Sequence, residues 1–369
     1  MIASNLCAGL AQKGHEVKAL GLHYAGNEHN FPFSILPCPD IRAVTAMFHN
    51  FCVALWKPDV VIVALDIPQQ RFFLRTFQQY GVPYIGITPL ESGPLCMTWA
   101  MICMQMKACF FISQHGADEA KKKGVPAEHL QIGIDIASWR LPEAEERKAI
   151  RDVLGVEDDT FVILTVADNQ ERKNPARALE IVAAFGEKYP KFKYIMVTRE
   201  HCPVGMEIRD FAADLGINDR LDIYERGISF KQLWSLYAAA DAFLLASKAE
   251  GLGVPFLEAM AVGVPVVGTR TGALVEHVEQ GGGWLIEPDY DFTDMFGNGK
   301  RYFANVQSGM ECLEKVYEGG VDIEAAVKKA RAYVESRTWE IPILQLDETI
   351  RRIVDDEKAQ KELQHAAAV

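Results

Sequence analysis

Residues 241–272 have the sequence DAFLLASKAEGLGVPFLEAMAVGVPVVGTRTG, and this stretch decides the expected fold. It predicts a buried strand over 241–247, a loop that carries Glu250, a helix opened by Pro255, and a second apolar strand over 264–269. Strand, glycine turn and helix in this order are typical of a parallel α/β sheet. In such a sheet, ligands bind beyond the carboxyl ends of the strands.

Two carboxylates follow the first of these strands. Glu250 lies in the loop and Glu258 in the first turns of the helix, with seven residues between them. A helix N-terminus offers free N–H groups and a partial positive charge to a phosphate. Carboxylates would repel a phosphate, so they suit hydroxyl groups such as those of a sugar and a ribose. The arrangement indicates a nucleotide-sugar site; two solvated glutamates on an ordinary helix are the alternative.

The longer pattern S-x-x-E-G-x-G-x-P-x-x-E-A-M-A-x-G-x-P-V-V-G-T, over 247–269, resembles the E-x7-E signature of the retaining glycosyltransferases of family 4. These enzymes have the GT-B fold, and the resemblance implies a hexosyltransferase that uses a UDP- or GDP-linked sugar. It implies that Glu250 contacts the sugar and Glu258 the ribose. It assigns further donor contacts to the glycine turn: Gly251, Leu252, Gly253 and Val254.

A second stretch, VADNQERKNPARALE over 166–180, resembles the V-A-R-N-Q-P-R-K-N segment of one branch of family 4. The resemblance implies that Lys173 and Arg172 hold the donor diphosphate, with Asn169 nearby. This basic pair replaces a divalent metal, so neither a metal nor another cofactor is expected. Asp168 departs from the pattern, because the family has an arginine there. Either Arg172 compensates for it, or Asp168 points away and caps the helix that begins near Asn174.

Two further segments complete the expected site. GITPLESGPLCMTW, over 86–99, resembles the P-x-D/E-G-x-P-L stretch of the same branch, which implies that Glu91 contacts the donor sugar or the acceptor. A helix-capping glutamate is the alternative for Glu91. The loop at Arg226 and Gly227 follows a strand, where GT-B proteins hold the base through backbone groups. His277 is expected at the rim of the site.

Length and composition set the broad class. The chain has 369 residues, about half of them apolar, which is enough for two domains. A net charge of −12 argues against a nucleic-acid partner. The eight cysteines form no Cys-x-x-Cys pair, which favours free thiols in the cytoplasm. No apolar run reaches the ~18 residues of a transmembrane helix, although peripheral membrane contact stays possible.

Strand and helix patterns alternate along most of the chain, which predicts two Rossmann-like domains with parallel sheets that face each other across a cleft. We expect an N-terminal acceptor-side domain over 1–140 and a donor-binding domain over 141–337. The segment 338–369 is predicted to be a helix that crosses back onto the first domain, ending in a tail. Residues 3–22 resemble the first helix and second strand of a GT-B domain. The first strand is absent from this sequence, which predicts a gap in the N-terminal sheet.

Three functions are compatible with these patterns. The first is a retaining glycosyltransferase that acts on an unidentified acceptor, which could be a glycan, a lipid-linked glycan or a protein. The second is a non-catalytic nucleotide-sugar-binding protein of the same fold, which Asp168 and the gap in the sheet favour. The third is a GT-B enzyme of another reaction type, such as an epimerase or a phosphorylase. Glu250, Glu258 and Lys173 favour the first.

Overall fold

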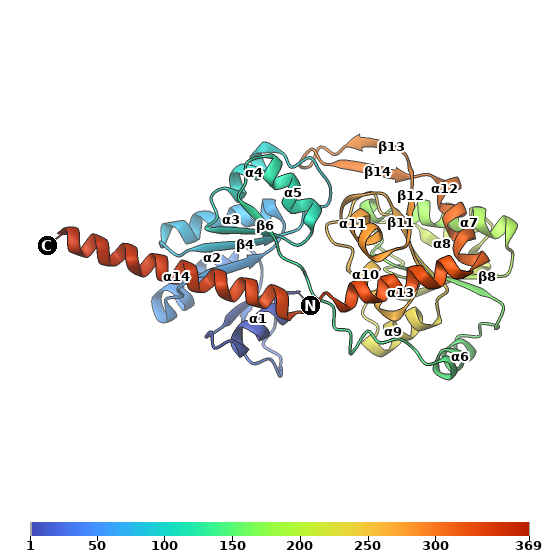
Figure 1. Cartoon of the computed structure of the whole chain (residues 1–369), viewed down its shortest axis with the longest axis horizontal. Coiled ribbons are helices and arrows are strands. Elements are labelled where there is room, and N and C mark those ends of the chain that lie inside the picture. The colour runs from blue at the N-terminus through green and yellow to red at the C-terminus, as the bar shows by residue number, and fades with distance from the viewer. Residues whose placement is uncertain (1, 369) are drawn as a thin grey trace. The chain divides into compact units, whose positions relative to one another are not determined.

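The computed structural model describes residues 2–368, except for the side chains of 51–54, 367 and 368. The chain packs into two compact units (Figure 1). Unit 1 contains the residues up to Leu90, Leu95–Gly133 and the residues from Thr338 on. Unit 2 contains Glu91–Pro94 and Ile134–Arg337. Among the residues described, no helix combines the length and the apolar character that crossing a membrane requires.

Unit 2 is built on a six-stranded parallel sheet in the order β12-β11-β10-β7-β8-β9. Its strands are β7 (Phe161–Val166), β8 (Phe192–Thr198), β9 (Leu221–Glu225), β10 (Ala242–Leu245), β11 (Val266–Thr269) and β12 (Trp284–Ile286). The chain builds outward from β7 to β9, then returns to β10 on the other side of β7. The order of strands therefore reverses between β7 and β10, and crevices that bind ligands form at such a point.

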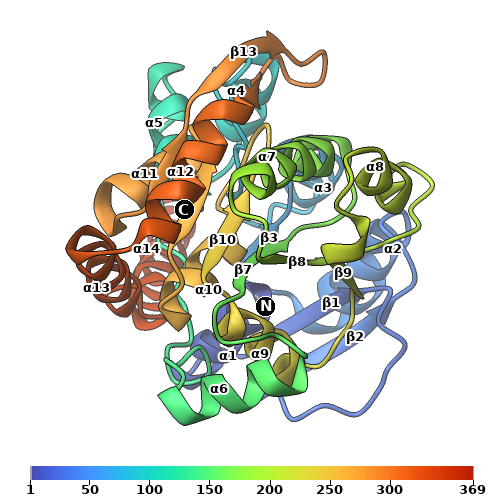
Figure 2. The same cartoon turned by 90° about the vertical axis from the view of Figure 1, so that its right-hand side faces the viewer.

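Helices cover both faces of this sheet, which explains why its strands are apolar throughout rather than alternating. Figure 2 shows α7, α8 and α12 on one face and α9 and α10 on the other. The helical segments are α6 (Ala144–Val153), η2 (Glu171–Lys173), α7 (Pro175–Lys188), α8 (Ile208–Asp214), η3 (Asn218–Arg220), α9 (Phe230–Ala239), α10 (Val254–Val262), α11 (Gly272–Gly281), α12 (Val306–Glu318) and α13 (Val321–Glu335).

Unit 1 contains two separate parallel sheets. One pairs β1 (Lys18–Leu22) with β2 (Ser34–Cys38), and the other has the order β3-β4-β5-β6. The second sheet consists of β3 (Val61–Ala64), β4 (Tyr84–Thr88), β5 (Ala108–Phe111) and β6 (Ala127–His129). The helices of the unit are α1 (Ile2–Gln12), α2 (Ala43–Met47), η1 (Phe48–Trp56), α3 (Ile67–Gln79), α4 (Met97–Cys103), α5 (Gln114–Lys122) and α14 (Glu340–Ala368).

The C-terminal helix α14 packs within unit 1, where α1 lies against it. A Cβ atom added at Gly9 would lie 2.1 Å from Ile343 Cδ1, so the glycine allows the two helices to approach closely. The His15 Nε2 atom lies 2.7 Å from Asp347 Oδ1 and adds a polar contact. The predicted parallel sheets in two Rossmann-like units, and the return of the final helix, are confirmed.

The predicted gap in the N-terminal sheet is present between β1 and β3. The two strands do not pair, and a cavity of about 900 Å³ is lined by residues of both. Apolar side chains close it from several helices: Leu6, Leu10, Phe73, Phe77, Leu346 and Ile350.

Backbone amides that face this cavity should lose their protons to solvent faster than their sequence neighbours. Val61 and Leu65 donate their N–H groups toward β4, so alternation directs Ile62 and Ala64 to the opposite edge. We expect NMR-detected hydrogen exchange to be at least about tenfold faster at Ile62 and Ala64 than at Val63. Ile85 in β4, which has strands on both sides, is the protected control. Equal protection from exchange of the amides on the two edges of β3 would contradict a solvent-accessible gap between β1 and β3.

Two local predictions were wrong or incomplete. The apolar run over 130–134 predicts a strand, but β6 ends at His129. Ile134 instead donates its N–H to the Arg337 carbonyl oxygen at 2.9 Å, so burial there does not come from a sheet. The sequence analysis also missed an antiparallel hairpin of β13 (Pro288–Thr293) and β14 (Lys300–Ala304), although its turn contains the Asn298–Gly299 pair typical of hairpins.

Candidate active site

The candidate site lies at the carboxyl ends of β7 and β10, where the strand order of unit 2 reverses. The turn η2, which carries Arg172 and Lys173, begins five residues after the end of β7, and a loop with Glu250 follows β10. Lys248 donates its backbone N–H to the Arg172 carbonyl oxygen at 2.8 Å, which joins the two segments directly. Two parts of the chain that are 77 residues apart therefore form one surface.

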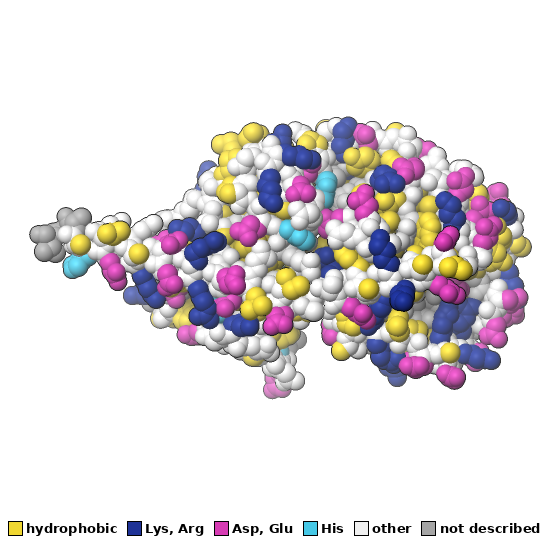
Figure 3. All heavy atoms as spheres, viewed as in Figure 1, with side chains coloured by type: hydrophobic (Ala, Val, Ile, Leu, Met, Phe, Trp, Pro, Cys, Tyr) yellow, Lys and Arg dark blue, Asp and Glu magenta, His cyan; other side chains and the backbone are white. Residues whose placement is uncertain are grey.

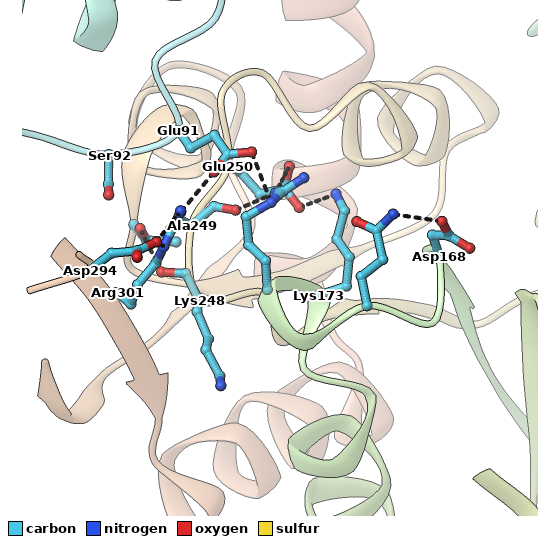
Figure 4. A network of polar contacts seen from close by, with 12 residues as sticks. Glu91, Ser92, Asp168, Lys173, Lys248, Ala249, Glu250, Asp294 and Arg301 are labelled. Carbon is cyan, nitrogen blue, oxygen red and sulfur yellow. Dashed lines mark hydrogen bonds and ion pairs between the residues drawn. The ribbon is translucent and has the colours of Figure 1, made fainter. Parts of the chain in front are cut away.

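Arg172, Lys173 and Glu250 form the centre of the site (Figure 4). The Lys173 ammonium lies 2.5 Å from one Glu250 carboxylate oxygen. The Arg172 guanidinium lies 3.6 Å from the other and donates to the Ala249 carbonyl oxygen at 2.7 Å. Both cations are thus directed toward the loop that precedes α10.

Burial and charge act in opposite directions on Glu250. Only 3% of the residue is exposed, and burial by itself would raise the pKa of its carboxyl group. The neighbouring Lys173 and Arg172 outweigh burial, so the pKa of Glu250 is held below its ordinary value. The carboxylate is therefore ionised at neutral pH and can accept hydrogen bonds from hydroxyl groups.

Glu91 packs with unit 2, although the sequence placed it in the N-terminal domain. Its carboxylate bridges two arginines: one oxygen lies 2.8 Å from Arg172 Nε and the other 2.8 Å from Arg301 Nη1. Arg301, on β14, also pairs with Asp294 at 2.6 Å. The structure thus connects Glu91 to the centre of the site. Its contacts are with two arginines and do not include a helix cap.

The hairpin β13–β14 supplies groups that the sequence analysis did not include in the site. Lys300 donates its backbone N–H to the Gly93 carbonyl oxygen at 2.9 Å, and Tyr302 donates to the Lys248 carbonyl oxygen at 2.9 Å. The Ser92 hydroxyl also donates to the Lys300 carbonyl oxygen. The hairpin therefore holds both the Glu91 segment and the Glu250 loop, and its turn signal was the feature that could have revealed it.

The glycine turn 251–254 leads directly into α10. Gly253 has a φ of +72°, a left-handed conformation that favours glycine, and it precedes the first residue of the helix, Val254. Gly272 has a φ of +47°, and a Cβ atom there would lie 2.3 Å from the Glu250 carbonyl oxygen and 2.5 Å from that of Glu91. The glycine thus allows a close approach of the backbone, and the segments of Glu250 and Glu91 meet there.

His277 is fully buried, so its predicted place at the rim of the site was wrong. Its Nε2 lies 2.7 Å from the Leu252 carbonyl oxygen, and its Nδ1 lies 2.9 Å from the Tyr333 hydroxyl. An N–H on Nε2 donating to Leu252, with Nδ1 accepting from Tyr333, satisfies both contacts. The imidazole therefore holds the glycine turn in place through the Leu252 carbonyl oxygen. A sequence pattern cannot distinguish this buried position from one at the rim of the site.

Asp168 binds two arginines at the ends of neighbouring strands. Arg199, which follows β8, donates to both carboxylate oxygens at 2.7 Å, and Arg226, which follows β9, lies 3.0 Å away. These hydrogen bonds and charges hold the pKa of Asp168 below its ordinary value, against the effect of burial. Asp168 makes no cap at Asn174, and Arg172 is turned toward Glu91, so neither alternative for Asp168 describes its contacts.

Asn169 and the loop at 226–227 lie on the same edge of the sheet. The side-chain amide of Asn169 makes two hydrogen bonds with the backbone of Met206. It donates to the Met206 carbonyl oxygen at 2.8 Å and accepts from the Met206 N–H at 3.0 Å. Gly227 has a φ of +97°, which favours glycine there. The donor contacts expected of Asn169, Arg226 and Gly227 stay predictions.

Glu258 lies within α10 and is only 6% exposed. Its carboxyl group lies 3.0 Å from the Tyr237 hydroxyl, which also lies 3.2 Å from the Pro255 carbonyl oxygen. The single hydrogen of the Tyr237 hydroxyl cannot be donated to both acceptors. A protonated Glu258 can donate to the Tyr237 oxygen, while Tyr237 donates to the Pro255 carbonyl oxygen. Burial accordingly raises the pKa of Glu258 to about 7, although the Tyr237 contact opposes the shift. Its expected contact with a ribose stays a prediction.

Because of this pKa, the stability of the free protein should fall as pH rises from about 4.5 to about 7. The folded state retains the proton that the unfolded state loses, so the contribution is present below pH 4.5 and is lost through pH 7. At about 1.4 kcal/mol per pH unit, the loss is about 3 kcal/mol. Urea denaturation across this range should show a smaller decline for Glu258→Gln. Parallel pH profiles of variant and parent would contradict the assignment.

Comparisons with known proteins find relatives of a part of the chain. Residues 146–295 match the family model described as "Glycosyl transferases group 1". The GDP-mannose-dependent alpha-(1-6)-phosphatidylinositol monomannoside mannosyltransferase of Mycolicibacterium smegmatis is 29% identical over 161 residues, which cover 42% of this chain and 41% of that protein. The chain thus aligns with about two fifths of the length of this relative.

Solved structures resemble a much larger part of the chain. Sucrose-phosphate synthase from Thermosynechococcus elongatus has a TM-score of 0.75 at 17% identity, covering 95% of this chain and 92% of that one. The Anabaena protein HepE, solved in complex with UDP and glucose, has a TM-score of 0.69 at 17% identity, covering 94% and 95%. These likenesses show the fold. Residues 146–295 therefore match the glycosyl transferases group 1 model, and the chain that carries them has the GT-B fold.

Proposed function

We propose that this protein transfers a hexosyl group from a nucleoside-diphosphate sugar to a hydroxyl group of an acceptor, with retention at the anomeric carbon and without a divalent metal. One observation carries the proposal: Arg172, Lys173 and Glu250 meet at the point where the strand order of unit 2 reverses. Cations suited to a diphosphate lie there beside a carboxylate suited to sugar hydroxyls.

In this proposal the bond from the anomeric carbon to the diphosphate breaks, a bond to the acceptor oxygen forms, and the proton of the acceptor hydroxyl passes to the departing diphosphate. Negative charge develops on the departing diphosphate, where Lys173, Arg172 and the N-terminus of α10 stabilise it. Glu250 accepts hydrogen bonds from the sugar hydroxyls, and Glu91 contacts the sugar or the acceptor. Glu258 and residues 251–254, with Asn169, Arg226 and Gly227, take the nucleoside and the remaining donor contacts.

In the structure, two carboxylates lie where the proposal places the phosphates of the donor. Glu250 neutralises Lys173, and Glu91 neutralises Arg172. We expect the diphosphate to displace these carboxylates from the two cations on binding, which leaves Glu250 free to accept from the sugar. The carboxylates thus keep the cations ordered before the donor arrives, and an ordered site loses less conformational entropy on binding.

The names of related proteins support a UDP- or GDP-linked donor. The mycobacterial relative is named as GDP-mannose-dependent, and the Anabaena structure contains UDP and glucose. We place the reaction in the cytoplasm, since the described cysteines are free thiols, as expected in a reducing compartment. The acceptor, whether a glycan, a lipid-linked glycan or a protein, is left open by the proposal.

A thermal-shift panel with UDP, GDP, ADP and dTDP, each alone and as a sugar conjugate, tests the donor site. A nucleotide at about 100 times its dissociation constant adds about 2.7 kcal/mol of stability, enough to raise Tm by several degrees. A shift with one nucleotide family should then be accompanied by hydrolysis or transfer of the matching sugar. No shift from any nucleotide would overturn the proposal.

The same panel separates the second candidate, a non-catalytic nucleotide-sugar-binding protein. Asp168 favours it, since its carboxylate occupies a position where the family has a cation, and it is paired with Arg199 and Arg226. Binding of a sugar nucleotide without any turnover, even with a range of acceptors, would support this candidate over the transferase.

A further inference from the structure

The outer face of α4 in unit 1 exposes a row of methionines. Met97, Met101 and Met104 are 55%, 57% and 43% exposed, whereas Ala100, Ile102 and Cys103 between them are buried. The spacing of four and three residues places the three thioethers along one side of the helix. Large apolar side chains gathered on an exposed face indicate a surface that binds another molecule. The flexible methionine side chain can adapt to a partner whose surface is irregular or fluid.

Cationic side chains surround this row. The strands β3, β4, β5 and β6 lie in sequence order, so right-handed crossovers place α3, α4 and α5 on the same face of the sheet. On α3, Arg71 and Arg75 are exposed and flank the exposed Phe72, and α3 contains no acidic residue. The methyl group of Met104 lies 3.8 Å from the position a Cβ atom would take at Gly124, directly after the lysine run 121–123.

Few acidic groups offset these cations. On α5, Asp118 accepts from Gln114 at 2.7 Å, and Glu119 pairs with Lys122. Lys107 lies 3.5 Å from Glu357 of α14. Arg71, Arg75, Lys121 and Lys123 have no ion-pair partner among the residues that the structure describes. The local balance is therefore positive on a chain whose net charge is −12.

Figure 3 shows hydrophobic side chains gathered over α4, with Lys and Arg side chains beside them. We propose that this methionine face, defined as Met97, Met101 and Met104 with Phe72, Arg71, Arg75 and the lysines 121–123, binds the surface of an anionic lipid bilayer. The thioethers and the Phe72 ring enter the boundary between headgroups and acyl chains, and the cations contact the lipid phosphates. The inference does not depend on the proposed sugar transfer.

Charge complementarity selects a lipid surface over a protein partner. A cation buried in a protein interface needs a partner at a fixed position, whereas a bilayer of anionic lipids supplies mobile phosphates to cations that lie on two separate helices, α3 and α5. The cations here alternate with exposed apolar groups, as in segments that lie in the interface plane of a membrane.

Flotation of the full chain with vesicles tests the inference. We expect binding to vesicles of phosphatidylcholine mixed with phosphatidylglycerol, weaker binding at high salt, and little binding to phosphatidylcholine alone. Met97→Gln/Met101→Gln/Met104→Gln should lower binding at least about tenfold. Arg71→Gln/Arg75→Gln should lower it by roughly fivefold for each arginine. Unchanged thermal unfolding confirms that each variant is folded.

Matched controls come from unit 2, which has exposed groups of the same kinds. Met295→Gln removes a methionine that is 98% exposed, and Lys148→Gln/Lys231→Gln removes two exposed cations. Both should bind anionic vesicles as the parent does. Failure of the parent to float with anionic vesicles would overturn the inference. So would an equal loss of binding in the control variants, or full binding by the triple methionine variant.

Discussion

Replacement of Glu250 by glutamine should lower kcat by about 10² to 10³ while the affinity for the free nucleoside diphosphate is retained or increased. The side chain keeps its size, but it loses the charge that accepts sugar hydroxyls and supports the positive anomeric carbon. At the same time Lys173 loses the carboxylate that neutralises it, and Arg172 loses one of its two carboxylate neighbours. The cations are then freer to bind a phosphate, so catalysis and nucleotide affinity should change in opposite directions.

Steady-state kinetics with the donor identified by thermal shift, together with calorimetric titration of the nucleoside diphosphate, measure the two effects. Glu311→Gln on α12 is the matched control, because that carboxylate is exposed and contacts only Gln307 among the interactions described for it. Its kcat and its nucleotide affinity should equal those of the parent. A Glu250→Gln enzyme with near-parental turnover would remove Glu250 from the mechanism.

Replacement of Lys173 by methionine should lower both kcat and nucleotide affinity, kcat by about 10² or more and affinity by at least about tenfold. Methionine retains the unbranched side chain but cannot donate to a phosphate oxygen. The loss should be larger in kcat, since charge on the diphosphate increases as the glycosidic bond breaks. Glu250 also loses its partner at 2.5 Å, which leaves a buried carboxylate with only Arg172 nearby.

The folding cost of this variant can be separated from its catalytic cost. Unpairing a buried charge destabilises a protein by about 3–5 kcal/mol, so Lys173→Met should lower the free energy of unfolding. The double variant Lys173→Met/Glu250→Gln should recover part of that stability and none of the activity. Lys188→Met on α7, whose side chain is 58% exposed, is the control and should change neither quantity. Parental nucleotide affinity in Lys173→Met would show that the diphosphate binds elsewhere.

Much of the fold could be predicted because each local signal was strong. The runs FVILTV and AFLL are apolar at every position, which is the pattern of strands covered on both faces. Gly253 and Pro255 marked the start of α10. Glycine is favoured just before a helix and proline in its first turn. The exceptions were short or ambiguous segments, such as 130–134, where apolar character comes from burial without strand pairing.

The chemistry of the candidate site was also visible in the sequence, as the spacing of Glu250 and Glu258 and the Arg172–Lys173 pair. Their roles in the folded chain were not, because a role depends on which charge lies beside which. Glu250 faces two cations and has a lowered pKa, whereas Glu258 faces a tyrosine hydroxyl and has a pKa raised to about 7. Two identical side chains eight positions apart thus differ in protonation through their neighbours alone.

The sequence by itself determined the two parallel α/β units, the glycine turn that opens α10, and the residue types of the proposed sugar-nucleotide site. Only the tertiary structure decided that Asp168 binds Arg199 and Arg226, that Arg301 reaches Glu91 from a hairpin, and that His277 is buried beneath the glycine turn. The reason is physical. Strand and helix formation depend on neighbours in sequence, whereas Coulomb interactions and hydrogen bonds act between groups within a few ångströms, wherever the chain brings them together.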